Sequence, residues 1–188
     1  MSIVPRFMIS YRNDDFYQFI DVIMIFGASI SAQRITIRRS SLDDLPKLAW
    51  VVVMIEDHGI PMSLIKRSDR LTYQSKQVNF LGPAVKRWYD GGIRRIPADI
   101  IIDDNLLALW ALSSIDVSYN KLEFNCDGTS VKLREYLVDT IRTTIGLSKT
   151  DVERDDKVVR VNPSCLPVVM EWMSNKIPRS VFDARYRT

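Results

Sequence analysis

Basic side chains alternate with apolar side chains in one short segment of the first half of the chain. On an extended strand, Arg34, Thr36 and Arg38 fall on one face, whereas Ile35 and Ile37 fall on the other. Guanidinium groups on one face of a strand can bind the phosphates of a nucleic acid. The same alternation is also typical of the solvated face of a half-buried sheet, and periodicity alone favours that second interpretation.

Further basic side chains widen this set in the same half of the chain. They lie beside the alternating strand, in the next hairpin, and in the segment that follows: Arg39, Lys66, Arg67, Arg70, Lys76, Arg94 and Arg95. Residues 1–100 carry 14 Lys and Arg against 10 Asp and Glu, whereas residues 101–188 carry 12 against 13. This excess of positive charge in the first half is compatible with a phosphate-rich partner.

Acidic, histidine and cysteine residues form no metal or nucleophile pattern in the sequence. Three aspartate pairs, at 43–44, 103–104 and 155–156, each begin a helix or lie in a turn, where capping and solvation explain them. One histidine (His58) and two cysteines (Cys126 and Cys165) can supply neither a Cys/His zinc cluster nor a disulfide framework. Since a phosphate-cradling glycine loop is also missing, we expect no small-molecule cofactor.

The elements that must position these residues follow from hydrophobic period and turn signals. Helices are predicted at 16–25, between Asp44 and Gly59, and at 83–90, 105–114, 130–145 and 164–174. Strands are predicted at 33–38, 63–67, 71–78, 121–125, 150–153 and 157–161. The turns within the pairs 63–78 and 150–161 are too short for a parallel crossover, so these pairs must be antiparallel hairpins.

The second half of the chain repeats the order of the first. Gly59 corresponds to Gly146 and Trp88 to Trp172, which gives a repeat spacing of about 85 residues. The predicted fold class is therefore α+β, with two pseudo-twofold α-β-α-β-β-α repeats whose antiparallel sheets are each covered by helices on one face. We place the first repeat at 1–97 and the second at 98–188, the latter with a basic C-terminal tail.

Several segments resemble the LAGLIDADG homing endonucleases, a family of two-repeat, single-chain DNA-cleaving proteins. The residues 88–92 (WYDGG) and 94–97 (RRIP) are similar to the family's linker between repeats, and Leu106–Ser114 to its second motif helix. The long helix that ends at Gly146-Leu147 also resembles the family. The first motif helix corresponds to residues 19–30, where Gly27-Ala28-Ser29-Ile30 replaces aspartate-glycine-serine-isoleucine. The resemblance covers most of the chain.

The resemblance implies a saddle of two sheets that lies on duplex DNA, with a carboxylate from each motif helix holding divalent cations. Carried over residue by residue, the acidic positions fall on Gly27 and Ser114, neither of which supplies a charged ligand. A shifted register would instead place Asp116 at the second position. The implied protein is a degenerate endonuclease that uses no Mg²⁺ and binds nucleic acid through the basic residues named above.

The predicted function is accordingly nucleic-acid binding without catalysis. The partner would be DNA or RNA, for example in intron splicing, an organellar ribosome or another ribonucleoprotein. One rival is an active Mg²⁺-dependent homing endonuclease that uses Asp116, and another is a protein–protein interaction module. The outward strand positions of the second half, Lys121, Glu123 and Asn125, suit phosphate poorly, which makes symmetric clasping of a duplex doubtful.

The sequence also carries expectations about cellular location. Its apolar stretches are too short to span a bilayer and its N-terminus lacks the apolar region of a secretory signal, so we expect an intracellular protein without a membrane partner. Because the family is widespread in organelle introns, the resemblance points to mitochondria.

Overall fold

The computed structural model describes residues 15–39, 45–67, 70–116 and 119–186. The first repeat contains α1 (Asp15–Ile25), β1 (Ser29–Ser31), β2 (Arg34–Arg39), α2 (Leu45–Asp57), β3 (Met62–Arg67), β4 (Arg70–Ser75) and α3 (Gly82–Trp88). A small hairpin of β5 (Tyr89–Asp90) and β6 (Ile93–Arg94) follows. The second repeat contains α4 (Asp104–Ser114), β7 (Ile115–Asp116), β8 (Lys121–Asn125), α5 (Val131–Ile145), β9 (Val152–Arg154), β10 (Val158–Val161), α6 (Leu166–Ser174) and α7 (Arg179–Tyr186).

Each repeat builds one four-stranded antiparallel sheet, which confirms the predicted α+β class with two repeats. The strand orders are β1-β2-β4-β3 and β7-β8-β10-β9, and both predicted hairpins are antiparallel. Each repeat also holds one strand more than predicted, namely β1 and β7. These strands have three and two residues, which is too short for a period of two to become visible in the sequence.

Helix α5 shows how local sequence determines an element of this fold. The hydroxyl of Ser130 accepts a hydrogen bond from the backbone N–H of Leu133 at 3.2 Å and so caps the first turn. Gly146 ends the helix with φ 81°, a left-handed conformation that glycine adopts without strain. Leu137 and Ile141 lie on the buried stripe between these two ends.

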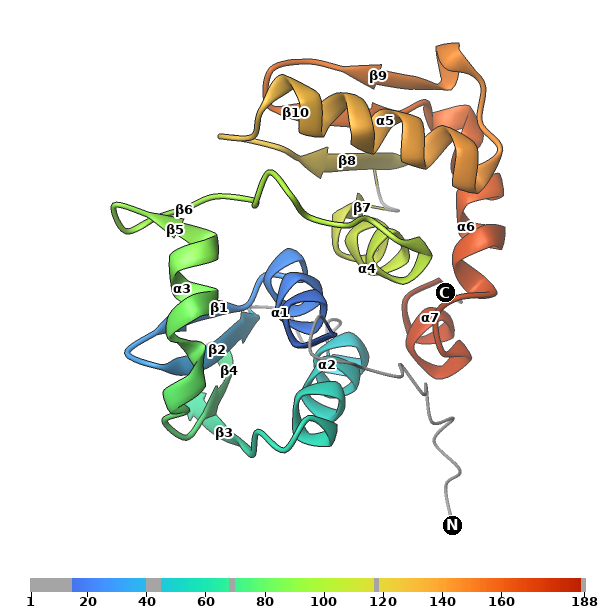
Figure 1. Ribbon diagram of the computed structural model, residues 1–188. Helices are drawn as coiled ribbons and strands as arrows, with labels where there is room; N and C mark the ends of the chain where they lie inside the picture. Colours follow the sequence, from blue (N-terminus) through green and yellow to red (C-terminus); the bar gives the residue numbers. More distant parts are fainter. Residues whose placement is uncertain (1–14, 40–44, 68–69, 117–118, 187–188) are drawn as a thin grey trace.

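The two motif helices, α1 and α4, pack against each other at the centre of the molecule (Figure 1). The small buried side chains of Ala108 and Ala111 lie on α4. The first motif helix is shorter than the predicted 19–30, because the backbone N–H of Gly27 bonds to Met24 O at 3.0 Å in the turn after Ile25. Residues 29–31 then leave the helix and pair with β2.

A buried carboxylate joins α1 to α3. Asp21 is only 3% exposed, and it accepts hydrogen bonds from the indole of Trp88 at 2.7 Å and from Arg87 at 2.8 Å. Arg87 also donates to both carboxylate oxygens of Asp99 at 2.6 Å, and its two acidic partners raise the pKa of its guanidinium. The buried charge of Asp21 is therefore paired and hydrogen-bonded.

The C-terminal segment contains helix α7, which includes most of the residues that the sequence analysis named a basic tail. Helix α7 packs against α2 of the first repeat, and Val181 is buried in that contact region. Within the described residues, no helix has the length and apolar character needed to cross a membrane.

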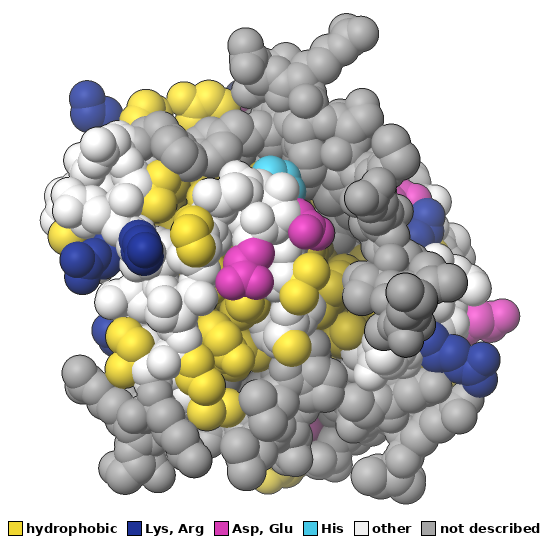
Figure 2. Space-filling view, turned by 90° about the horizontal axis from the view of Figure 1, so that it is seen from below, with side chains coloured by type: hydrophobic (Ala, Val, Ile, Leu, Met, Phe, Trp, Pro, Cys, Tyr) yellow, Lys and Arg dark blue, Asp and Glu magenta, His cyan; other side chains and the backbone are white. Residues whose placement is uncertain are grey.

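The lower side of the molecule carries mixed surface chemistry. Exposed apolar side chains of the first repeat include Val53 on α2 and Leu64 on β3, which are 40% and 49% exposed. Figure 2, which views this side, shows hydrophobic side chains interspersed with acidic and basic ones.

Candidate nucleic-acid interface and central cavity

The sheet of the first repeat presents a basic polar face. Arg34 lies opposite Ser31 and Arg38 opposite Thr72 in the strand register, and both arginine side chains are exposed. Strands β1 to β4 together contain six basic residues and no acidic residue. The opposite face carries Ile35 and Ile37, which are fully buried. The alternation predicted from the sequence therefore holds for these two arginines.

Thr36 does not share their exposure. It was predicted to face outward, but it is 3% exposed because its neighbours in the sheet cover it. Ser29 and Gln74 flank it in the register, and its hydroxyl accepts a hydrogen bond from the Gln74 side-chain amide at 3.2 Å. Thr36 thus orients Gln74 on this face and is not itself accessible to a partner.

For the four other basic residues of this sheet, the structure describes the backbone register but not the side chains. Arg67 and Arg70 lie opposite each other at the hairpin end, in the row that continues from Arg34 and Arg38. Lys66 and Arg39 each lie opposite Leu71, in the row of the buried isoleucines. The register therefore assigns only the first pair to the polar face.

In the sheet of the second repeat, acidic side chains pair with the basic ones. Its strands contain three basic and three acidic residues. Glu123 forms ion pairs with Lys121 at 2.8 Å and with Arg160 at 2.6 Å, and these two cations lower the pKa of its carboxyl. Arg160 also pairs with Asp155 at 3.0 Å. The strands of the two sheets thus differ in net charge: those of the first are basic, and those of the second are neutral.

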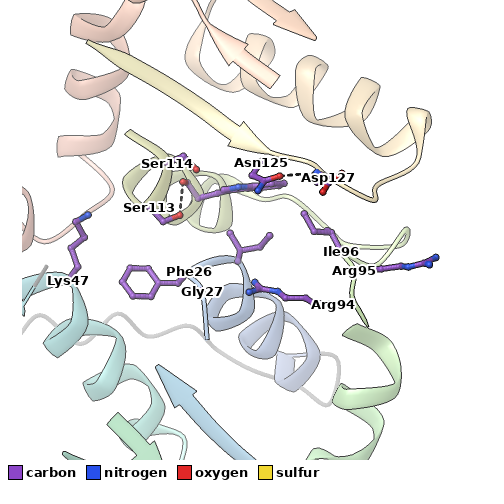
Figure 3. Close-up of a pocket in the computed structure, with 12 residues that line it drawn as sticks. Phe26, Gly27, Lys47, Arg94, Arg95, Ile96, Ser113, Ser114, Asn125 and Asp127 are labelled. Carbon is purple, nitrogen blue, oxygen red and sulfur yellow. Dashed lines mark hydrogen bonds between the residues drawn. The ribbon is translucent and has the colours of Figure 1, made fainter. Parts of the chain in front are cut away.

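A cavity of about 610 Å³ lies where α1 and α4 end (Figure 3). The two positions that the resemblance assigned to metal-binding acids, Gly27 and Ser114, both line it. The fold therefore brings together two positions that are far apart in the sequence. Other polar residues of the lining are Lys47, Arg94, Arg95, Ser113, Asn125 and Asp127.

The lining does not fit the metal ions that this architecture implies. Mg²⁺ in such sites requires carboxylate ligands, but Gly27 has no side chain and Ser114 offers a neutral hydroxyl. Among the described lining residues, only Asp127 has a carboxylate, and this residue is exposed. Asp116 is not in the lining, and its Oδ1 accepts a hydrogen bond from the backbone of Tyr119 at 3.3 Å. The described residues contain no group of three or more His, Cys, Asp or Glu that could hold a metal.

Cations instead contact the C-terminal turns of both central helices. Lys47, which is 4% exposed, donates from Nζ to the carbonyl of Leu112 in the last turn of α4 at 3.3 Å. Arg94 donates to the carbonyl of Met24 in the last turn of α1. Although Arg94 as a residue is exposed, burial of its guanidinium, which lies 5.5 Å from the Trp88 ring, lowers its pKa. Both contacts are favourable, because a helix C-terminus carries partial negative charge.

The remaining predicted basic residues are scattered. Arg95 lines the cavity but pairs with Asp90 at 3.0 Å, and Figure 3 shows it pointing away from the helix ends. Lys76 is exposed just beyond β4. Lys47 is a lining residue that the sequence did not predict, although a signal was present: positions 47, 51 and 55 share one helix face, and Val51 and Ile55 are buried.

Comparisons with known proteins show the fold. No family model and no curated protein sequence matches the chain. A solved structure of the homing endonuclease I-WcaI bound to its DNA recognition sequence matches with a TM-score of 0.57 at 12% identity, covering 98% of this chain and 95% of that one. A structure of I-DmoI in complex with DNA and Ca matches with a TM-score of 0.51 at 10% identity, covering 87% and 96%. The chain therefore has the two-repeat fold of the LAGLIDADG homing endonucleases.

Proposed function

We propose that this protein binds a nucleic-acid duplex, mainly through the sheet of its first repeat, and does not cleave it. The observation that carries the proposal is the charge of β1 to β4, whose strands contain six basic and no acidic residues. Arg34 and Arg38 lie four positions apart on β2, and both are exposed on one face of that sheet. Basic side chains on a sheet bind phosphates without regard to sequence.

The structural neighbours support a nucleic-acid partner. The matched structures of I-WcaI and I-DmoI both contain DNA. The difference between the two sheets argues for an unequal contribution from the two repeats. Lys121 and Arg160 are held by Glu123 within the second sheet, so a phosphate would have to compete with that carboxylate. The first sheet is therefore the stronger phosphate-binding surface.

The absence of cleavage is supported by the two helix ends. Hydrolysis of a phosphodiester in this architecture needs carboxylates to hold divalent cations at the scissile phosphates. Gly27 and Ser114 have no carboxylate to supply. The carboxylate of Asp116 accepts a hydrogen bond from the backbone N–H of Tyr119 and does not line the cavity. A role in which bound nucleic acid is held intact, as in intron splicing or a ribonucleoprotein particle, agrees with this site.

The proposal is tested by measuring binding to duplex DNA and to double-helical RNA at several salt concentrations. Replacing both Arg34 and Arg38 by Ala should flatten the log–log salt dependence by about one to two units, since each neutralised phosphate contributes about 0.9. The matched control is the double variant Lys121→Ala/Arg160→Ala, which removes the same charge from the other sheet and should change the slope less. Comparing the two ligands decides between DNA and RNA.

Two results would overturn the proposal. If the wild-type protein binds neither ligand even at low salt, the first sheet is an ordinary solvated surface. If the control variant weakens binding as much as the Arg34→Ala/Arg38→Ala variant, the two sheets contribute equally, and the assignment to the first repeat is wrong.

A further inference from the structure

We propose that the β5–β6 hairpin contacts the bases of the bound nucleic acid, with Ile93 inserted as an apolar wedge at a base step. This inference rests on the proposed function, because the duplex is the one that the first sheet binds. It goes beyond that function by adding a second contact surface, which binds through apolar burial rather than through charge and which deforms the duplex.

The inner face of the hairpin is anchored to the protein. Tyr89 and Arg94 lie opposite each other in the strand register. The hydroxyl of Tyr89 accepts a hydrogen bond from the backbone N–H of Ile30 on β1 at 3.1 Å. Arg94 donates to the carbonyl of Met24 in the last turn of α1. The hairpin is therefore fixed against both the first sheet and a central helix.

The outer face of the hairpin presents an isoleucine to solvent. Asp90 and Ile93 form the register pair next to the anchored one, and side chains alternate along a strand, so this pair points away from the protein. Ile93 is 65% exposed. The turn consists of Gly91 and Gly92, both with positive φ, and a methyl group on either would meet no described atom within 4 Å. The tip of the hairpin is therefore narrow enough to enter a groove.

The charges beside Ile93 cancel each other. Arg95 forms an ion pair with Asp90 at 3.0 Å, which places Arg95 on the same outer face. Figure 3 likewise shows Arg95 pointing away from the helix ends. A neutral face gains little from phosphates, whereas isoleucine is one of the side chains that insert between base steps and unstack them. The chemistry of this face therefore fits bases better than phosphates.

The hairpin also lies where a bound duplex can reach it. Its anchor Ile30 belongs to β1, the edge strand of the first sheet, and the neighbouring strand β2 carries Arg34 and Arg38. Arg95 lines the central cavity, so the hairpin lies between that cavity and the sheet. Figure 1 shows the hairpin projecting from the body of the molecule. A duplex on the basic sheet face that extends past β1 would meet Ile93.

A second exposed isoleucine supplies a matched control. Ile101 is 67% exposed, but it lines a groove with Tyr17 and Asp99 near the N-terminal end of α1. The central cavity lies at the other end of that helix. Ile101→Ala therefore removes the same side chain at the same exposure as Ile93→Ala, but away from the proposed contact.

The wedge is tested with the duplex, DNA or RNA, that binds best in the salt titrations. Ile93→Ala should weaken binding on the order of tenfold, because it removes an apolar side chain that becomes buried only in the complex. The log–log salt slope should stay unchanged, since no phosphate contact is lost. Ile101→Ala should change neither quantity. Both side chains are exposed, so melting curves should show both variants as stable as the wild type.

The deformation of the duplex gives a second readout. TA steps unstack easily, so 2-aminopurine is placed at the TA steps of the duplex, where its fluorescence rises when it loses its stacking neighbours. The wild-type protein at saturation should raise this fluorescence. Ile93→Ala should not, whereas Ile93→Leu, which keeps the apolar volume, should restore the rise.

Failure of this inference can be distinguished from failure of the proposed function. If Arg34→Ala/Arg38→Ala flattens the salt slope but Ile93→Ala weakens binding no more than Ile101→Ala, the hairpin contact is wrong and the sheet interface stands. If binding depends on Ile93 but not on Arg34 and Arg38, the hairpin contact stands and the assignment to the first sheet falls. If binding depends on Ile93 without any rise in fluorescence for the wild type, the side chain does not enter the base stack, and the wedge is overturned.

Discussion

The indole nitrogen of Trp88 donates a hydrogen bond to the carboxylate of Asp21 across 67 positions of sequence, at 2.7 Å. This bond, together with the two that Arg87 donates to the same carboxylate, fixes the end of α3 against the middle of α1. The hairpin of β5 and β6 follows α3 directly and carries Arg94. The buried carboxylate therefore determines where one of the two cavity cations lies.

The first prediction concerns this carboxylate. Asp21→Ala should destabilise the protein by about 3–5 kcal/mol, because it leaves the Trp88 N–H and a partly buried guanidinium without their partner. The free energy of unfolding should be measured by urea denaturation with tryptophan fluorescence.

A matched control removes the other acid that Arg87 contacts. The Asp99 side chain is 76% exposed, so Asp99→Ala should cost no more than about 1 kcal/mol although its contacts to Arg87 are as short. Equal losses in the two variants would show that burial of Asp21 does not govern the strength of this network.

The second prediction concerns cleavage. The protein should produce no nicks or double-strand breaks in a bound duplex with Mg²⁺ or Mn²⁺, because the helix ends carry Gly27 and Ser114. Products should be followed on denaturing gels with supercoiled plasmid as a sensitive substrate. Specific cutting that disappears in Asp116→Asn would establish the active-endonuclease alternative.

The third prediction separates the two faces of β2. Ile35 is fully buried, so Ile35→Asp should unfold the first repeat by placing an unpaired charge in the core. Its exposed neighbour provides the control: Arg34→Ala should change stability by less than about 0.5 kcal/mol. Thermal melts of both variants test this, and a stable Ile35→Asp protein would mean that this face of the sheet is not covered by helices.

The fourth prediction concerns pH. Burial raises the pKa of the Cys126 thiol to about 11 from an ordinary value of 9.0. In the unfolded chain the thiol loses its proton first, so the folded state binds more protons between about pH 9 and pH 11 and stability falls as pH rises through that window. The loss is about 1.4 kcal/mol for each pKa unit.

The contribution of Cys126 is isolated by subtracting the stability of Cys126→Ala at each pH, since lysines and tyrosines also titrate there. A thiol-specific reagent supplies a second readout at neutral pH. Cys165, which is partly exposed, should react in the native protein, whereas Cys126 should react only after unfolding. Fast modification of native Cys126 would show that the turn after β8 opens readily.

Prediction from the sequence succeeded where the signal was local. Helix α5 could be read from the spacing of its leucines and isoleucines, its capping serine and its terminal glycine. The strand β2 could be read from its alternation. By contrast, the short strands β1 and β7 gave no period. The pattern predicted helix 16–25, which agrees with α1, whereas the family resemblance extended the motif helix wrongly to residue 30.

The candidate site depended more on contacts between distant residues. The burial of Thr36 comes from Gln74, which lies 38 positions away, and no local pattern reveals it. Lys47 reaches α4 across 65 positions. Its place on the buried stripe of α2 could have been noticed, but what it contacts could not. The degenerate positions Gly27 and Ser114 were found only because the resemblance to a known family pointed to them.

The contact of α7 with α2 imposes an order in time on the synthesis of this protein. The first repeat supplies α2 early, but its partner α7 is translated only after both sheets. Helix α1 likewise lacks its partner α4 until the second repeat is synthesised. A nascent first repeat must therefore expose apolar surface until the second repeat has emerged. Closing such long loops is entropically slow, so folding should be late and concerted.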